Sequence, residues 1–191
     1  MCTIFLGWFS CKAQGTWTPK ADFGGGVRKQ AVGFNVGIYG YIAFGVNDTA
    51  GPKDIWEYNP QLNFWTQKAD IPTEFGRESA AGFSIGMYGY VGTGKGSIGE
   101  LDDLWRYDPS TNTWEMKADF GGGDRSNAVG ISIGDKGYIG TGLSSTNARK
   151  KDWWEYDSVN DTWTQKSDLP APSRHLATGF AIGEKGYLCL G

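Results

Sequence analysis

The residues best suited to ligand chemistry are arginines that recur along the chain. They stand at spacings of 49, 48 and 49 residues, as Arg28, Arg77, Arg125 and Arg174, and the second and fourth are followed directly by Glu78 and His175. A guanidinium presents its N–H donors in a planar fork that binds carboxylates bidentately, so such a set suits an acidic ligand or an acidic protein segment. These arginines, with Glu78 and His175, are the candidate binding residues.

The same arginines have an alternative, structural interpretation. Each could donate to a loop carbonyl or pair with a neighbouring acidic residue such as Asp22, Asp70, Asp119 or Asp168. Their recurrence in every repeat favours this structural role, because recognition residues are normally found where a repetitive scaffold varies.

Residue sets for catalysis or metal binding are scarce. His175 is the only histidine in the sequence, so neither a histidine-rich zinc or copper site nor a Ser/His/Asp set can be assembled within it. Asp102 and Asp103 are adjacent, so we expect their carboxylates to point apart rather than to face each other as an acid/base pair. The glycines have turn spacing and lack the strand–loop–helix context of a phosphate site. We therefore expect no catalytic residue, no metal and no cofactor.

Composition indicates what kind of fold positions these residues. Of 191 residues, 30 are glycine and nine are tryptophan, with no low-complexity run. Internal glycine disfavours a helix by about 1 kcal/mol per position, whereas aromatic residues favour strands. The sequence therefore predicts an all-β fold of short strands joined by glycine turns. The net charge is −3 and no basic run exceeds residues 149–151, so we expect no nucleic-acid partner.

The first thirteen residues differ from the rest. Residues 1–10 are largely apolar but shorter than the roughly 20 residues of a membrane span. They resemble the hydrophobic region of a signal peptide, and Cys11-Lys12-Ala13 offers small residues for cleavage before Gln14, although no basic segment precedes them. We expect residues 1–13 to be a truncated signal peptide, residues 14–191 to be the mature domain, and the protein to be secreted or at the cell surface (in a bacterium, the periplasm or outer surface). An inner strand of the fold is the alternative interpretation of this segment.

A repeat of about 49 residues organises the remainder of the chain. Four series of residues share this period, namely Trp17, Trp65, Trp114 and Trp163; Trp56, Trp105 and Trp154; Tyr41, Tyr90, Tyr138 and Tyr187; and the arginines. Within one period we predict strands at 80–85, 90–93, 104–107 and 113–116. A Gly-x-x-Gly turn, such as Gly86 to Gly89, joins the first two, and we expect its last glycine to take a positive φ.

The order Gly-Phe-Ser-Ile-Gly (82–86), Gly-Tyr-Val-Gly-Thr-Gly (89–94), Asp-Leu-Trp-Arg-Tyr-Asp-Pro (103–109) and Asn-Thr-Trp (112–114) resembles the Kelch repeat. The resemblance covers residues 16–191 and is nearest to secreted bacterial Kelch proteins, within the superfamily of galactose oxidase and Kelch-type propellers. It implies a β-propeller in which each repeat forms one four-stranded antiparallel blade. The copper centre of galactose oxidase is not implied, because its histidine ligands are missing.

The repeats predict an incomplete ring. We expect a lone fourth strand around Trp17, full blades at about 28–69, 77–118 and 125–166, and only two strands of a further blade at 174–191. Propellers of this family usually have more blades, often six or seven, so we expect the remaining blades to be partners of this chain. Without them, an apolar blade face and an unpaired strand edge should be exposed.

The loops that vary between repeats are where we expect function. Strand alternation places the loops between second and third strands (46–53, 95–103 and 143–152) on the same face as the connections between blades. We expect a non-catalytic binding or scaffold module that recognises a protein or glycan through this face. The alternative is part of a sugar-acting Kelch enzyme resembling sialic acid mutarotases, with Arg77, Glu78 and Arg125 in its site and further residues supplied by other blades.

Overall fold

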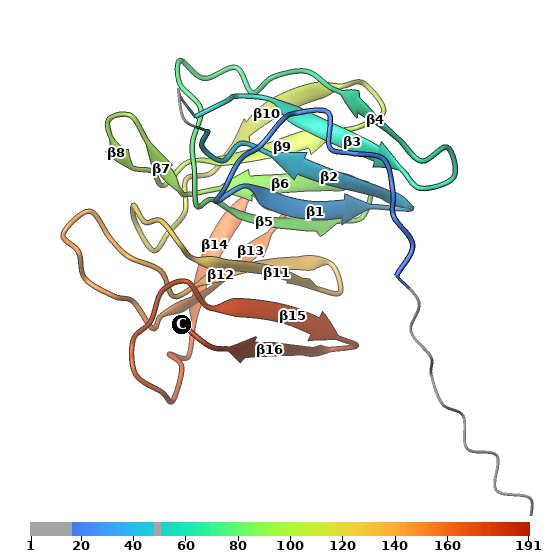
Figure 1. Ribbon diagram of the computed structural model, residues 1–191. Helices are drawn as coiled ribbons and strands as arrows, with labels where there is room; N and C mark the ends of the chain where they lie inside the picture. The colour runs from blue at the N-terminus through green and yellow to red at the C-terminus, as the bar shows by residue number, and fades with distance from the viewer. Residues whose placement is uncertain (1–16, 48–50) are drawn as a thin grey trace, which may run out of the picture.

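The computed structural model describes residues 17–47 and 51–191, and this part of the chain folds into strands and no helix (Figure 1). Blade 1 contains β1 (Val32–Val36), β2 (Tyr39–Ala43), β3 (Ile55–Asn59) and β4 (Phe64–Gln67). Blade 2 contains β5 (Ala81–Ile85), β6 (Tyr88–Gly92), β9 (Leu104–Asp108) and β10 (Thr113–Lys117). Blade 3 contains β11 (Val129–Ile133), β12 (Lys136–Gly140), β13 (Trp153–Asp157) and β14 (Thr162–Lys166). The predicted antiparallel four-stranded blades are confirmed.

Two smaller sheets complete the described fold. A short hairpin of β7 (Lys95–Gly96) and β8 (Gly99–Glu100) lies in the loop between β6 and β9. Blade 4 has only β15 (Thr178–Ile182) and β16 (Lys185–Cys189), as expected for residues 174–191. The expected leader, residues 1–13, lies outside the described residues.

The predicted strand around Trp17 is wrong. No strand is assigned between residues 17 and 31, and the Trp17 side chain is exposed. A fourth strand forms by pairing with the third strand of its own blade, as β4 pairs with β3. No such third strand lies beside Trp17 within the described residues, so this segment has nothing to pair with.

The glycine with a positive φ in the first hairpin of each blade is the first of the Gly-x-x-Gly turn, not the last as predicted. The φ angle is 57° at Gly86, and Ile85 pairs directly with Tyr88. The turn is therefore only two residues long, and a positive φ at its first position suits the twist of the strands. The last glycine, Gly89, lies inside β6, where its small size serves the packing between blades.

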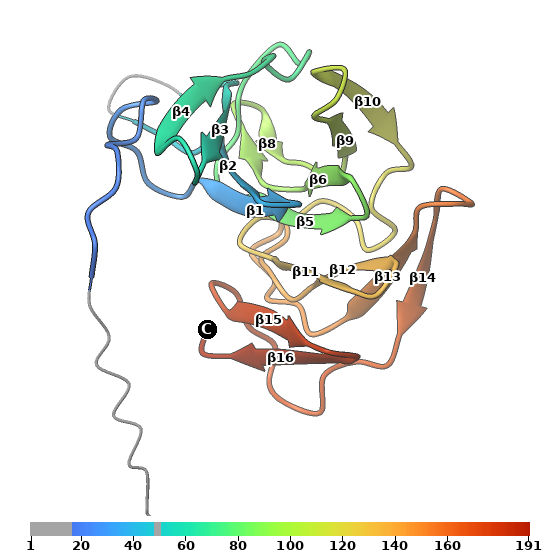
Figure 2. The ribbon, with the colours of Figure 1, turned by 90° about the vertical axis from the view of Figure 1, so that its right-hand side faces the viewer.

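The first strands of successive blades pack against one another around the axis, β1 against β5, β5 against β11 and β11 against β15 (Figure 2). The apolar core therefore lies between blades. The inner strands are closely packed at their glycines. A Cβ atom on Gly82 would lie 2.5 Å from Cγ2 of Val32, and one on Gly130 would lie 2.8 Å from the carbonyl oxygen of Gly82.

One aromatic contact recurs between neighbouring blades and is called here the blade-to-blade contact. A Phe on the first strand of a blade stacks on a Tyr on its second strand. The Phe then packs on a Gly on the second strand of the next blade, and the Tyr packs on a Tyr on the third strand of that blade. In blade 2, Phe83 and Tyr90 stack with centroids 5.2 Å apart, Phe83 fills the space beside Gly137, and Tyr90 meets Tyr156 at 5.6 Å. In blade 1, Phe34 and Tyr41 make the same contact with Gly89 and Tyr107. Tyr107 and Tyr156 therefore pack between blades.

A second link between blades runs through the backbone just before each first strand. Four residues here have φ between 55° and 59°, a backbone region that residues other than glycine rarely adopt. They are Gln30, Ser79, Asn127 and Leu176. The amide of Ser79 donates to the carbonyl of Gln30 (2.9 Å), Asn127 to Ser79 (2.9 Å) and Leu176 to Asn127 (3.1 Å). These residues form a belt in which blades 2, 3 and 4 each donate one hydrogen bond to the blade before.

Candidate functional site

The loops between second and third strands and the connections between blades share one side of the molecule, opposite the short hairpin turns (Figure 1). Between blades 1 and 2 they enclose a groove of about 440 Å³. Its walls come from three segments: the loop before β3, the connection from β4 to β5, and the β7–β8 hairpin. This volume falls within the usual range for ligand pockets, roughly 300–1,000 Å³. The groove, named the inter-blade groove below, is the candidate site.

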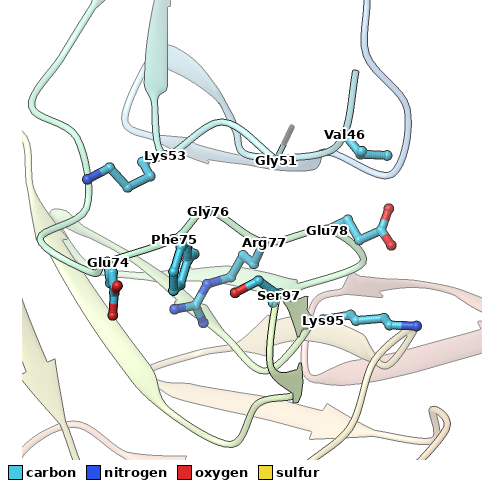
Figure 3. Close-up of a pocket in the computed structure, with 11 residues that line it drawn as sticks. Val46, Gly51, Lys53, Glu74, Phe75, Gly76, Arg77, Glu78, Lys95 and Ser97 are labelled. Atoms are coloured by element: carbon cyan, nitrogen blue, oxygen red, sulfur yellow. The ribbon is translucent and has the colours of Figure 1, made fainter. Parts of the chain in front are cut away.

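Figure 3 shows how the side chains of the groove are arranged. Phe75 and Arg77 lie in the middle, with Lys53 and Glu74 on one side and Glu78 and Lys95 on the other. The Phe75 ring is 48% exposed. The Lys53 ammonium donates to the carbonyl of Thr73 at 3.1 Å, which ties the loop before β3 to the connection. The groove therefore offers an aromatic surface flanked by both ammonium and carboxylate groups.

Arg77 forms the base of the groove and is 2% exposed. Its Nη1 and Nη2 atoms lie 2.5 and 2.6 Å from the two carboxylate oxygens of Asp103, and Nη1 also donates to the carbonyl of Thr93 at 3.1 Å. Asp103 immediately precedes β9, and its backbone accepts from Thr93 at the end of β6. The pairing of these two strands thus brings the carboxylate beneath the arginine.

The same arrangement recurs in the neighbouring blades. Arg28 pairs with Asp54, and Arg125 pairs with Asp152 at 2.7 and 3.0 Å. In each blade the aspartate also accepts from the indole N–H of the tryptophan two residues later, as in Asp152 and Trp154. The expected structural role of the arginines is supported. The expected acidic partners are wrong, because the carboxylates lie across the sheet at Asp54, Asp103 and Asp152 instead of at Asp22, Asp70 and Asp119. Asp168 pairs with Lys151, and Arg174 donates to backbone carbonyls.

The electrostatics of this pair are clearest in blade 3. Burial alone would raise the pKa of Asp152, but hydrogen bonds from Arg125 and Trp154, together with the charge of Arg125, outweigh it and lower the pKa. The carboxylate is therefore held ionised, and the guanidinium of Arg125 is fully buried. These ion pairs are parts of the blade interior. Most N–H groups of their guanidiniums already donate to the aspartate or to backbone carbonyls, so few remain for a ligand.

Arg77 differs from its counterparts in one respect. Arg28 and Arg125 also donate from Nη2 to glycine carbonyls, those of Gly25 and Gly122, in the Gly-Gly-Gly connections before them. The connection before Arg77 reads Pro-Thr-Glu-Phe-Gly and is one residue longer. The Nε atom of Arg77 is buried and has no hydrogen-bond partner among the described residues. A buried unpaired donor is costly, and the equivalent Nε of Arg125 by contrast donates to the carbonyl of Gly123 at 3.4 Å.

The other sequence-predicted residues are dispersed. The Glu78 side chain is half-buried and lines the inter-blade groove and a second hollow of about 580 Å³ with Val27 to Gln30. Arg174 donates to the carbonyls of Pro172 (3.3 Å) and Leu190 (3.0 Å), and His175 is half-buried beside it in blade 4. Each arginine lies within its own blade, so the four guanidiniums do not form one cluster.

Sequence reasoning identified the loops of the groove but not its individual residues Lys53, Phe75 and Lys95. A usable signal was present. The connection at 72–76 is the one between full blades that replaces Gly-Gly-Gly with larger side chains and adds a residue. A break in an otherwise regular repeat marked the site.

Among the described residues, no cluster for a metal ion is found, and Asp102 and Asp103 have different surroundings. Within 17–47 and 51–191, no group of three or more His, Cys, Asp or Glu side chains is placed to hold a metal ion. Burial and the charge of Asp119 raise the pKa of Asp102, while the adjacent Asp103 carboxylate binds Arg77. In the same part of the chain, no helix has the length and apolarity to cross a bilayer.

Comparison with known proteins supports the fold. The Kelch motif matches residues 88–121, which contain β6 to β10 and the start of the connection that follows. No protein of curated function matches the sequence significantly. A solved structure titled "Structure of YjhT" superposes with a TM-score of 0.76 at 19% identity, covering 86% of this chain and 59% of that chain.

At 19% identity this likeness concerns the fold alone, and the chain spans 59% of the length of that protein. In all, 165 chains of solved structures match significantly, so the fold is common and does not specify an activity. The repeated four-stranded blades, the Kelch motif in blade 2 and this structural likeness together show that the chain has the fold of a Kelch-type β-propeller.

Proposed function

We propose that this chain is a binding module that recognises a glycan through the inter-blade groove. The observation that carries the proposal is the combination of the half-exposed Phe75 side chain with the ammonium and carboxylate groups that line the groove around it. An aromatic ring offers an apolar platform for the face of a sugar. Lys53 and Lys95 can donate to sugar oxygens, and Glu74 and Glu78 can accept from hydroxyl groups.

The charges of the groove favour a hydroxyl-rich ligand over a strongly acidic one. The two lysines are offset by the two glutamates, and the charge of Arg77 is matched by Asp103. Polar groups of both kinds around an aromatic surface suit a ligand that both donates and accepts hydrogen bonds. A protein ligand bound through the same loop face is the other form of this proposal.

A glycan array probed with the full chain, followed by calorimetric titration of any hit, tests the proposal. Phe75→Ala should weaken binding about tenfold or more, which corresponds to about 1.4 kcal/mol. Phe64→Ala is the matched control, because Phe64 is an exposed phenylalanine on the outer strand β4. Equal affinity of both variants, or binding to no glycan, would contradict glycan recognition in this groove.

A second candidate is participation in a sugar-acting enzyme of the mutarotase kind. It is favoured by Glu78, a half-buried carboxylate at the boundary of two hollows, where it could move a proton at a sugar oxygen. Other residues of such a site would come from further blades. Proton NMR of anomeric exchange, comparing the complete propeller with its Glu78→Gln variant, tests it. An unchanged exchange rate would exclude this role.

The proposed location of the module is outside the cytoplasm. The support is the apolar segment before Cys11-Lys12-Ala13, which has the pattern of an export signal. The mature chain should then begin at Gln14 or within a few residues of it. Mass spectrometry of exported protein that retains residues 1–10 would contradict cleavage.

A further inference from the structure

A hollow of about 620 Å³ lies between blades 3 and 4 on the loop side of the molecule. One wall is the loop before β13, with Arg149, Lys150 and Lys151. The other wall is the connection from β14 to β15, with Asp168 and Ser173. The ammonium of Lys151 lies 3.5 Å from the carboxylate of Asp168, so an ion pair joins the two walls. We call this space the basic hollow.

The basic hollow has the same position in blade 3 that the inter-blade groove has in blade 1. Lys151 is the equivalent of Lys53, because each stands directly before the aspartate that binds the buried arginine of its blade. Lys53 lines open space between two complete four-stranded blades. This position of the repeat therefore stays accessible when the blade that follows has all of its strands.

The loop of blade 3 breaks the repeat in its charge. Residues 149–151 read Arg-Lys-Lys, whereas the equivalent residues read Gly-Pro-Lys at 51–53 and Glu-Leu-Asp at 100–102. Three consecutive cations thus occur in one loop of a chain whose net charge is −3. Recognition residues are normally found where a repetitive scaffold varies, so this loop is a candidate for binding an anion.

The carboxylates of the basic hollow are already engaged. Asp152 accepts from Arg125 at 2.7 and 3.0 Å and from the indole N–H of Trp154 at 2.9 Å. Asp168 pairs with Lys151. Arg125 and Lys151 therefore offset these two negative charges, and neither carboxylate repels an incoming anion as an isolated one would.

The donors of the hollow, by contrast, are available. Arg149 is exposed and Lys150 is half-buried, and neither side chain forms an ion pair within the part of the chain that the structure describes. In residues 17–47 and 51–191, the side chains of Gln165 and Ser173 have no hydrogen-bond partner either. Because the two carboxylates are offset, the positive charges of Arg149 and Lys150 remain to attract a ligand.

We propose that the basic hollow binds the phosphate monoester group of an anionic ligand. Such a group carries about −1.5 to −2 charges at pH 7 and three acceptor oxygens. It matches the charges of Arg149 and Lys150 and accepts from a guanidinium and an ammonium at the same time. A carboxylate or a sulfate ester carries a single charge and leaves one of these cations unmatched. The site is separate from the inter-blade groove, so it does not depend on glycan recognition there.

Amide chemical shifts of the isotope-labelled full chain, titrated with methyl phosphate at constant ionic strength near neutral pH, test the proposal. Methyl sulfate and acetate are the comparison anions, because each is small and carries one charge. We expect saturable shifts at the amides of 149–151 and Ser173. Methyl phosphate should bind about fivefold more tightly than either comparison anion, and Arg149→Gln and Lys150→Gln should each weaken its binding about fivefold.

Lys185→Gln is the matched control, because Lys185 is an exposed lysine beside the first hairpin turn of blade 4, on the opposite side of the molecule. This variant should bind methyl phosphate as the wild type does. All three variants should keep the thermal midpoint of the wild type, since none of them removes a buried ion pair. The absence of saturable shifts, equal affinity for the three anions, or unchanged affinity in either loop variant would overturn the proposal.

Discussion

Replacing Arg125 with alanine measures how much the buried arginine stabilises its blade. The guanidinium is fully buried, binds Asp152 through two hydrogen bonds and donates to the carbonyls of Thr141 and Gly122. It also lies over the Phe120 ring, 4.6 Å from the centroid. The alanine variant loses all of these interactions together and leaves the Asp152 carboxylate without its counter-charge.

The expected cost follows from that unpaired carboxylate more than from the lost attraction. Removing one partner of a buried ion pair destabilises a protein by about 3–5 kcal/mol, because the remaining charge is still desolvated. Three backbone carbonyls, those of Thr141, Gly122 and Gly123, also lose a charged donor, which places this variant toward the upper end. With a urea m-value of about 2 kcal/mol/M, the midpoint should fall by about 1.5–2.5 M.

Urea unfolding followed by tryptophan fluorescence provides the assay, with Arg149→Ala as the matched control. Arg149 is an exposed arginine on the same loop side of blade 3, and its removal should change the free energy of unfolding by no more than about 0.5 kcal/mol. If both variants unfold at the same urea concentration, the arginine is not the structural centre of its blade, and a ligand-binding role for this series becomes the better explanation.

Three further predictions follow from the packing and the ion pairs. Gly137→Ala should cost about 1–3 kcal/mol, since its Cβ would lie 2.1 Å from a buried phenylalanine of blade 2, whereas Gly96→Ala, with 3.4 Å of clearance, should be nearly neutral in the same urea assay. The pKa of Asp152 is lowered in the folded state, so its contribution to stability is complete above the unfolded pKa of about 3.9 and is lost as pH falls through the folded pKa. Asp152→Asn should therefore lose less unfolding free energy than the wild type below about pH 5. Parallel curves of unfolding free energy against pH would contradict this. Trp105→Ala should cost about 3–5 kcal/mol and Ile98→Ala about 0.5 or less, and coincident thermal midpoints would refute the assignment of one to the core and the other to a loop.

The blade architecture could be predicted because its determinants recur at a fixed period. The predicted strand at 104–107 corresponds to β9 (Leu104–Asp108), and that at 113–116 to β10 (Thr113–Lys117). The strand predicted at 90–93 begins two residues earlier, at Tyr88, because the Gly-x-x-Gly segment contains a two-residue turn. Periodicity marks equivalent positions well, but it does not say which of them lie in the turn.

Periodicity also marks a position without proving that a strand forms there, as Trp17 shows. The tryptophan keeps the spacing of its series, yet a strand needs a partner, and the described chain provides none at that point.

The partners of the arginines could not be read from nearby sequence. Asp103 lies 26 residues after Arg77 and reaches it only because β6 pairs with β9. The aspartates at 54, 103 and 152 share the period of the tryptophans that follow them, so the two series together contained the information. The absence of a hydrogen-bond partner for Nε of Arg77 among the described residues depends on loop geometry, which the sequence pattern does not determine.

The belt of Gln30, Ser79, Asn127 and Leu176 has a consequence for how genes of this kind change length. Each repeat brings one amide donor and one carbonyl acceptor to the belt, so duplication or loss of a whole repeat keeps donors and acceptors balanced. Unequal recombination between repeats therefore alters the number of blades without leaving a backbone amide or carbonyl near the axis without a hydrogen-bond partner. A deletion of half a repeat also leaves the belt balanced, because one residue supplies both groups, but it removes strands from the sheet of that blade.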